Sequence, residues 1–160
     1  MDRIIHCSTR LDCAPGLAFE MFTVGEFIQS WLAPLAEVEP VAGGRYELFW
    51  EPGRGENNST IGCKVIAIEP CEFLSFEWKG PRQFKHLMNE ADPLTHVVVF
   101  FVPCSDGVIA RTGVHLMHSG WGETVQWREA RRWFERAWQS AFEELKAQVS
   151  SRHIAAALCV

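Results

Sequence analysis

Residues 124–149 read TVQWREARRWFERAWQSAFEELKAQV, and this stretch decides the fold. It holds no proline or glycine, so nothing interrupts helical backbone hydrogen bonding. At a rise of ~1.5 Å per residue the stretch is a rod of roughly 39 Å, long enough to cross a small domain. Its apolar residues recur at the three- and four-residue intervals that place side chains on one helix face; they are Trp127, Ala130, Phe134, Trp138, Ala141, Leu145 and Val149.

The segments before this helix alternate between apolar and polar residues, which is typical of half-buried β-strands. In residues 73–79, for example, Leu74, Phe76 and Trp78 share one side of the predicted strand. Turn-forming residues separate the segments. The sequence therefore predicts an α+β fold in which a curved antiparallel sheet wraps around the long helix. The predicted strands are residues 3–12, 45–51, 61–69, 73–79, 95–102 and 108–118.

Two short helices are predicted after the first strand. Pro15 suits the first turn of a helix, because its missing N–H is not needed there. Thr23 and Glu26 have the spacing of a capping box, which predicts that Thr23 caps the second helix. Pro34 ends that helix, because the residue before a proline disfavours helical geometry.

The 160 residues are predicted to form one domain over residues 1–149, followed by a C-terminal tail at 150–160. The tail is either an extension of the long helix or a segment that docks elsewhere. Residues 80–94 combine glycine and proline with mixed charges, so we expect a long loop there, with a helical turn near its middle.

Composition excludes several classes of function. The net charge of −5 and the pI near 5.7 argue against nucleic-acid binding, since no basic run is present. The chain begins without the apolar segment of a signal peptide, and no stretch approaches the ~18 apolar residues of a membrane span. The expected location is the cytoplasm.

Motifs for metal binding and catalysis are missing. The six cysteines form no C-x-x-C pair, so we expect reduced, buried thiols. His115 and His118 lie three apart in a predicted strand and point to opposite faces, so they do not share a metal ion. No nucleotide-binding or hydrolase motif occurs. The sequence predicts no catalytic residue, no metal and no cofactor.

Seven tryptophans are the most unusual feature of the composition. Large aromatic side chains either fill a core or line a cavity for an apolar ligand, and the residues leave both interpretations open. A curved sheet around one helix often leaves its concave side unfilled. In the predicted cavity Tyr46 and His118 would orient a polar group of the ligand. The candidate cavity residues are Trp31, Tyr46, Leu48, Trp50, Phe76, Trp78, Val114, Leu116, His118, Phe134 and Trp138.

An ordered series of short motifs spans the chain up to about Val149. The series resembles the helix-grip fold of the START-like superfamily (SRPBCC, or Bet v 1-like). Within that superfamily it is most similar to the domain at the C-terminal end of the activator of the heat-shock protein 90 ATPase. The motifs are Ala18–Thr23, Trp31-Leu32 with Pro34, Gly43–Tyr46, Gly62–Pro70 with Phe76 and Trp78, Thr112–Trp121, and Trp138 with Phe142 and Leu145.

The resemblance implies an antiparallel sheet that grips the long helix, often around an apolar cavity. Superfamily members bind lipids, polyketides or hormones, and a few catalyse cyclisation. The first expected function is therefore binding of a small hydrophobic or amphipathic ligand between the sheet and the helix, without established catalysis. The alternative is a protein-interaction module acting on a chaperone or another protein. The separate N-terminal domain of the eukaryotic co-chaperone has no counterpart in these residues, so chaperone activation is not expected to carry over.

Overall fold

A computed structural model describes the backbone of residues 3–158 and side-chain surroundings as far as residue 152. The elements follow the order expected for the predicted α+β fold, with strands and long helices in separate runs. Strand β1 (Ile5–Leu11) precedes helices α1 (Pro15–Thr23) and α2 (Gly25–Ile28). Strands β2 (Leu35–Val38), β3 (Tyr46–Phe49), β4 (Val65–Glu69), β5 (Phe73–Trp78), β6 (Thr95–Pro103) and β7 (Thr112–Ser119) follow, and helix α4 (Val125–Leu158) comes last. Short helical turns lie at η1 (Pro52–Arg54), η2 (Arg82–Phe84) and α3 (Lys85–Met88).

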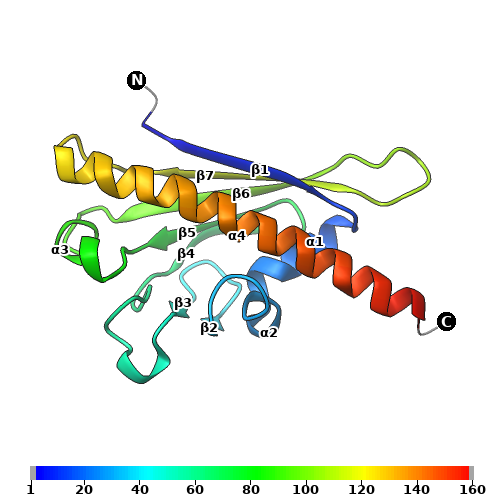
Figure 1. The fold of residues 1–160 in the computed structure, drawn as a ribbon, viewed down its shortest axis with the longest axis horizontal. Helices are drawn as coiled ribbons and strands as arrows, with labels where there is room; N and C mark the ends of the chain where they lie inside the picture. Colours follow the sequence, from blue (N-terminus) through cyan, green and yellow to red (C-terminus); the bar gives the residue numbers. More distant parts are fainter. Residues whose placement is uncertain (1–2, 159–160) are drawn as a thin grey trace.

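Five strands form one antiparallel sheet in the order β1-β7-β6-β5-β4, and β2 pairs with β3 in a separate two-stranded sheet. The first strand therefore lies beside the last one, with Ile5 opposite His118. Helix α4 runs across the face of the larger sheet, and α1 and α2 lie toward one end (Figure 1). This arrangement confirms the predicted antiparallel sheet packed on one long helix.

Helix α4 buries the face that its sequence predicts. Ala130, Phe134, Trp138 and Leu145 are each at most 5% exposed, and Arg132 on the other side is exposed. The Thr124 carbonyl accepts a hydrogen bond from the N–H of Arg128, which starts the helical ladder. The helix has 34 residues and continues to Leu158, so residues 150–158 extend it.

Several local predictions were wrong. Thr23 does not cap α2: it ends α1, and its hydroxyl donates to the carbonyl of Phe19 instead. Strand β2 was not predicted, because four residues show too little alternation to be recognised. Strand β7 begins at Thr112 rather than at residue 108, because residues 104–111 form the loop of the β6–β7 hairpin.

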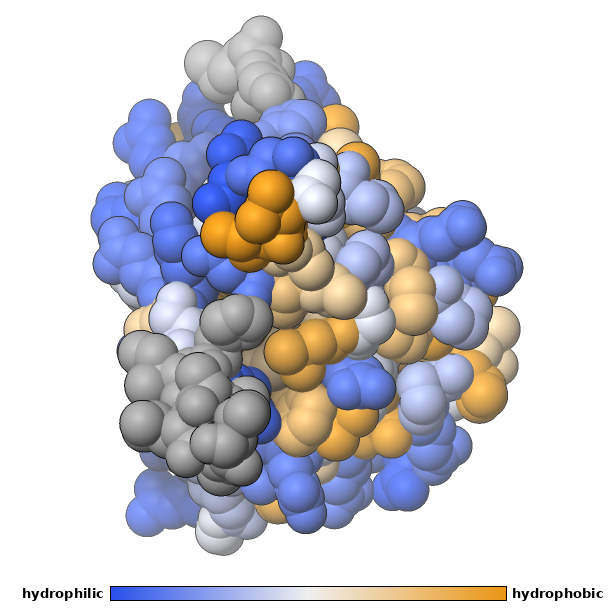
Figure 2. Space-filling view, turned by 90° about the vertical axis from the view of Figure 1, so that its right-hand side faces the viewer, coloured by the Kyte–Doolittle hydropathy of each residue, from blue (hydrophilic) through white to orange (hydrophobic). Residues whose placement is uncertain are grey.

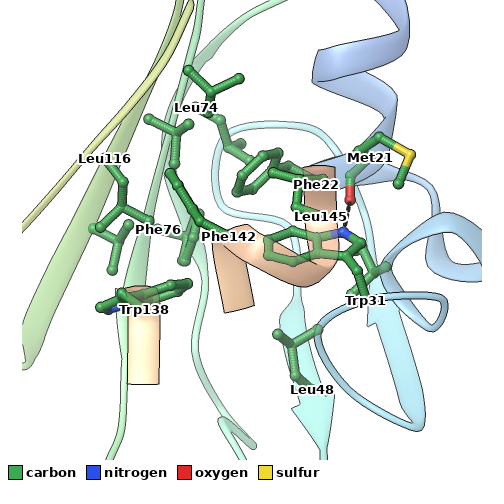
Figure 3. Packing of buried hydrophobic residues seen from close by; sticks show 14 of the residues in the cluster. Met21, Phe22, Trp31, Leu48, Leu74, Phe76, Leu116, Trp138, Phe142 and Leu145 are labelled. Atoms are coloured by element: carbon green, nitrogen blue, oxygen red, sulfur yellow. Dashed lines mark hydrogen bonds between the residues drawn. The ribbon is translucent and has the colours of Figure 1, made fainter. Parts of the chain in front are cut away.

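The core between α1, the sheet and α4 is built from interlocking aromatic rings. Trp31 follows α2 and donates its indole N–H to the Met21 carbonyl at 2.8 Å (Figure 3). The Trp31 ring packs edge-on against Phe22 at 4.9 Å and Phe142 at 6.3 Å between centroids. Edge-to-face contacts at these distances suit the charge distribution of aromatic rings. Trp31 therefore fastens the segment after α2 to the core beneath α4.

Candidate functional site

A pocket of about 430 Å³ opens beside α4, at the end of the sheet where β5 stops. One wall comes from the helix, one from residues that follow β3 and β5, and the rim from two loops. The lining residues are Leu32, Trp50, Asn58, Ser59, Trp78, Lys79, Gly80, Pro81, Gln83, Trp133, Phe134, Ala137, Trp138 and Ala141.

The helix wall owes its hollow shape to residue size. Trp133, Ala137 and Ala141 lie four residues apart on α4 and line the pocket together. The two alanines carry only a methyl group, so they leave room that a larger side chain would fill. Phe84 of η2 packs edge-on against Trp133 at 6.0 Å between ring centroids, which holds the loop after β5 against the helix.

The strand wall consists mainly of two indole rings. Trp50 follows β3, and its N–H donates to the Leu32 carbonyl at 2.9 Å, which fixes the ring plane. Trp78 ends β5 and contacts Trp50 at 5.8 Å and Trp138 at 5.1 Å between ring centroids. Trp78 is 3% exposed, and its indole nitrogen is buried without a hydrogen-bond partner.

The pocket rim is held by hydrogen bonds between two loops that are distant in sequence. The Asn58 amide donates to the Glu51 carboxylate at 2.8 Å, and its carbonyl oxygen accepts from the Arg82 backbone N–H at 2.8 Å. Lys85 donates to the Glu56 carbonyl at 3.0 Å. These contacts join residues 51–58 to residues 82–85, so the two loops form one continuous rim.

His118 lies outside the pocket, at a junction between the sheet and α4. Its Nδ1 accepts from the Trp138 indole N–H at 3.2 Å, and its Nε2 lies 3.0 Å from the Thr95 hydroxyl. Because indole only donates, Nδ1 carries no proton and Nε2 donates to the threonine. Burial, with a smaller contribution from nearby His96, holds the pKa of His118 well below its usual value of 6.5. His118 is therefore a neutral side chain whose two nitrogens are already occupied.

Tyr46 is likewise engaged within the protein. It is completely buried, and its hydroxyl donates to the Phe22 carbonyl at 2.8 Å. Its ring stacks on Phe76 with 3.9 Å between centroids. Burial raises the pKa of Tyr46. The hydroxyl thus bonds to the end of α1, and the ring belongs to the packed core.

The structure brings four of the eleven predicted cavity residues to the pocket: Trp50, Trp78, Phe134 and Trp138. The other seven are buried in the core and do not line the pocket: Trp31, Tyr46, Leu48, Phe76, Val114, Leu116 and His118. Sequence reasoning missed the loop residues of the rim, and also Trp133 with Ala137. The four-residue spacing of Trp133, Ala137 and Ala141 is the signal that could have found that helix wall.

Within the described residues, no group of three or more histidine, cysteine or acidic side chains is placed to hold a metal ion. Cys13 and Cys63 are buried thiols, as expected, and burial raises their pKa to about 11 and about 12. Cys71 and Cys104 are exposed, because they lie at a turn and in a hairpin loop, so that expectation was wrong for them. Cys159 lies outside the described residues. No helix in the described chain is both long and apolar enough to cross a membrane.

The antiparallel sheet, the long helix across it and the aromatic pocket beside that helix define a protein of the START-like, helix-grip class. A family model described as "Activator of Hsp90 ATPase homolog 1-like protein" matches residues 12–150, and the chain belongs to this family. The match confirms the family resemblance found in the sequence. No curated protein matches the chain by sequence.

Solved structures share the fold at low sequence identity. A Mesorhizobium loti protein is 22% identical with a TM-score of 0.69, over 94% of this chain and 98% of that one. An HSP90 activator from Plasmodium falciparum is 19% identical with a TM-score of 0.69, over 93% and 97% of the two chains. The Aha1 dimer from Colwellia psychrerythraea is 15% identical with a TM-score of 0.68, over 91% and 95%. At these identities the likeness establishes the fold alone.

Proposed function

We propose that the chain binds a small hydrophobic or amphipathic molecule in the pocket beside α4. The observation that carries this proposal is a cavity of about 430 Å³ with walls built from Trp50, Trp78, Trp133 and Trp138. Ligand sites in proteins are typically concave, mostly apolar and about 300–1,000 Å³ in volume. Burial of apolar surface would supply most of the binding free energy, so we expect selection by size and shape more than by chemical type.

Ala137→Leu tests this proposal, because the larger side chain would occupy the space that the alanine leaves. Ala147→Leu is the matched control, since Ala147 lies on the exposed side of the same helix. A panel of fatty acids, flavonoids and aromatic polyketides is titrated against each protein, with tryptophan emission and melting temperature as readouts.

We expect saturable binding of at least one ligand class to the wild type and to Ala147→Leu. Ala137→Leu should bind that class at least about tenfold more weakly, and its melting temperature without ligand should be close to that of the wild type. The proposal fails if no compound binds the wild type. It also fails if Ala137→Leu binds as tightly as the control.

Association with a chaperone of the Hsp90 type is the second candidate function. Exposed apolar side chains at the β6–β7 hairpin favour it: Val108 is 90% exposed, Val102 47% and Ile109 42%. Figure 2 views this end of the molecule and shows apolar residues gathered beside a hydrophilic surface. Contiguous exposed apolar surface often marks a site of protein interaction. Such a partner would be met in the cytoplasm, the location that the sequence predicts.

Binding to the purified chaperone can be measured by fluorescence anisotropy of the labelled chain. The variant Val108→Asp combined with Ile109→Asp should weaken binding at least about tenfold, because burying an unpaired carboxylate is costly. Val125→Asp is the control, since Val125 is 61% exposed at the opposite end of α4 from the hairpin. Equal binding by the hairpin variant and the control would argue against this interface.

A further inference from the structure

The indole nitrogen of Trp78 is the one buried side-chain polar atom in the described lining of the pocket that lacks a hydrogen-bond partner. Trp31, Trp50, Trp121 and Trp138 all donate their indole N–H to an acceptor of the protein, at 2.8–3.2 Å. Buried indole N–H groups usually find such a partner. The exception at Trp78 therefore requires an explanation, and Trp78 is a residue that lines the pocket.

None of the other polar side chains that line the pocket, Gln83 included, accepts a hydrogen bond from the Trp78 N–H. The Asn58 carbonyl oxygen accepts from Arg82, and the Ser59 hydroxyl donates to the Gly55 carbonyl at 2.6 Å. Lys79 donates to the Ile61 carbonyl at 2.6 Å and carries no acceptor. Within the described lining, the protein supplies no acceptor to Trp78. The position is therefore open to an acceptor on a molecule that enters the pocket.

We infer that the pocket takes an apolar molecule carrying one acceptor oxygen, a carbonyl or carboxylate group, which receives a hydrogen bond from the Trp78 indole N–H. This inference rests on the proposed function and adds the chemical class of the ligand. The rings of Trp50 and Trp138, which contact Trp78 and also line the pocket, pack against the apolar body of the molecule. An indole N–H only donates, so an alkane, or a ligand whose polar group only donates, gains nothing from this position.

A pair of probes of nearly equal shape tests the inference: 2-acetylnaphthalene, which carries a ketone oxygen, and 2-isopropenylnaphthalene, in which a methylene group replaces that oxygen. Each is titrated into the ¹⁵N-labelled full chain, and the assigned indole N–H signals of the tryptophans are followed by NMR. We expect the ketone to shift the Trp78 indole proton downfield and the hydrocarbon to leave it without such a shift. We also expect the ketone to bind about five- to tenfold more tightly, the usual effect of one hydrogen bond.

Two variants separate the hydrogen bond from the shape of the pocket. Trp78→Phe keeps an aromatic ring but removes the donor, so the preference for the ketone should fall below about twofold. Trp50→Phe is the matched control: its ring also lines the pocket, but its N–H is bonded to Leu32, so the preference should persist. If a variant does not fold, the Trp78 signal in the wild type still decides.

The outcomes distinguish this inference from the proposal on which it rests. If both probes bind the wild type with equal affinity and the Trp78 proton does not move downfield with the ketone, the pocket stands and the inference is wrong. The inference is also wrong if Trp50→Phe loses the preference as completely as Trp78→Phe does. If neither probe nor any compound of the wider panel binds, both the proposed function and this inference are wrong.

Discussion

Replacing Trp138 by alanine should destabilise the protein strongly. The side chain is 2% exposed and contacts Trp78, His118 and Phe142. A buried tryptophan removes roughly 200 Å² from water, which corresponds to about 5 kcal/mol at ~25 cal/mol per Å². Trp138 also lines the pocket, so part of its ring faces the cavity and makes no packing contact that the substitution could remove. We therefore expect a loss of about 3–4 kcal/mol from the apolar contacts.

The lost hydrogen bond adds to this cost. Without the Trp138 N–H, the buried Nδ1 of His118 has no donor, which costs about 1–3 kcal/mol. Trp138→Phe isolates this contribution, because it keeps most of the ring and removes the donor. Urea denaturation followed by far-ultraviolet circular dichroism gives the free energy of unfolding. Arg132→Ala on the exposed side of α4 is the control and should change it by less than about 0.5 kcal/mol.

A loss of unfolding free energy below about 1 kcal/mol for Trp138→Ala, with an unchanged slope of that free energy against urea concentration, would refute the packing role of Trp138. That role would also be refuted if Arg132→Ala proved as damaging, because the faces of α4 would then be wrongly assigned. A neutral Trp138→Phe would refute only the role of the hydrogen bond to His118 and leave the packing argument intact.

Three further predictions concern pH, a turn and a buried hydroxyl. His118 is protonated near pH 6.5 in the unfolded chain but stays neutral there in the folded chain. The stabilising contribution of His118 is therefore complete above that pH and is lost as the pH falls. Between pH 7 and 5 the unfolding free energy should fall more steeply in the wild type than in His118→Gln. Gly120 has φ +93° and an added Cβ would lie 3.1 Å from the Thr95 Cα, so Gly120→Ala should lower stability by more than about 1 kcal/mol in urea melts. Thr60→Val removes the hydroxyl that accepts from the Leu48 N–H and donates to the Tyr46 carbonyl, so thermal melts should report a loss of about 2 kcal/mol or more, and Thr60→Ser should recover most of it.

The sequence predicts the helix face well, because the 3.6-residue period leaves few choices. Phe134, Trp138 and Leu145 are all buried as their spacing requires. Alternation also placed Leu74, Phe76 and Trp78 on the inner side of β5. The predictions that were wrong depend on local competition. Thr23 could either cap α2 or bond back into α1, and its hydroxyl bonds to Phe19 because α1 extends to that residue.

The site is harder to predict, because a strand pattern tells which side chains point inward but not which of them leave space. Leu116 and Trp78 are both buried on the inner side of the sheet, yet of these two only Trp78 lines the pocket. The pocket exists because the small side chains of Ala137 and Ala141 form its helix wall, and because residues 51–58 and 80–85 form its rim. Such loops have no periodic signal, so their part in the rim could not be predicted from the sequence.

The pairing of β1 with β7 has a consequence for how the chain acquires its structure. Ile5 and His118 are partners although more than a hundred residues separate them. During synthesis the first strand must therefore wait, without its partner, until most of the chain has left the ribosome. Topologies that depend on such distant pairings fold slowly, because a long loop must close before the contacts can form. We expect the nascent chain to complete its sheet only late in translation, when β7 and the start of α4 have emerged.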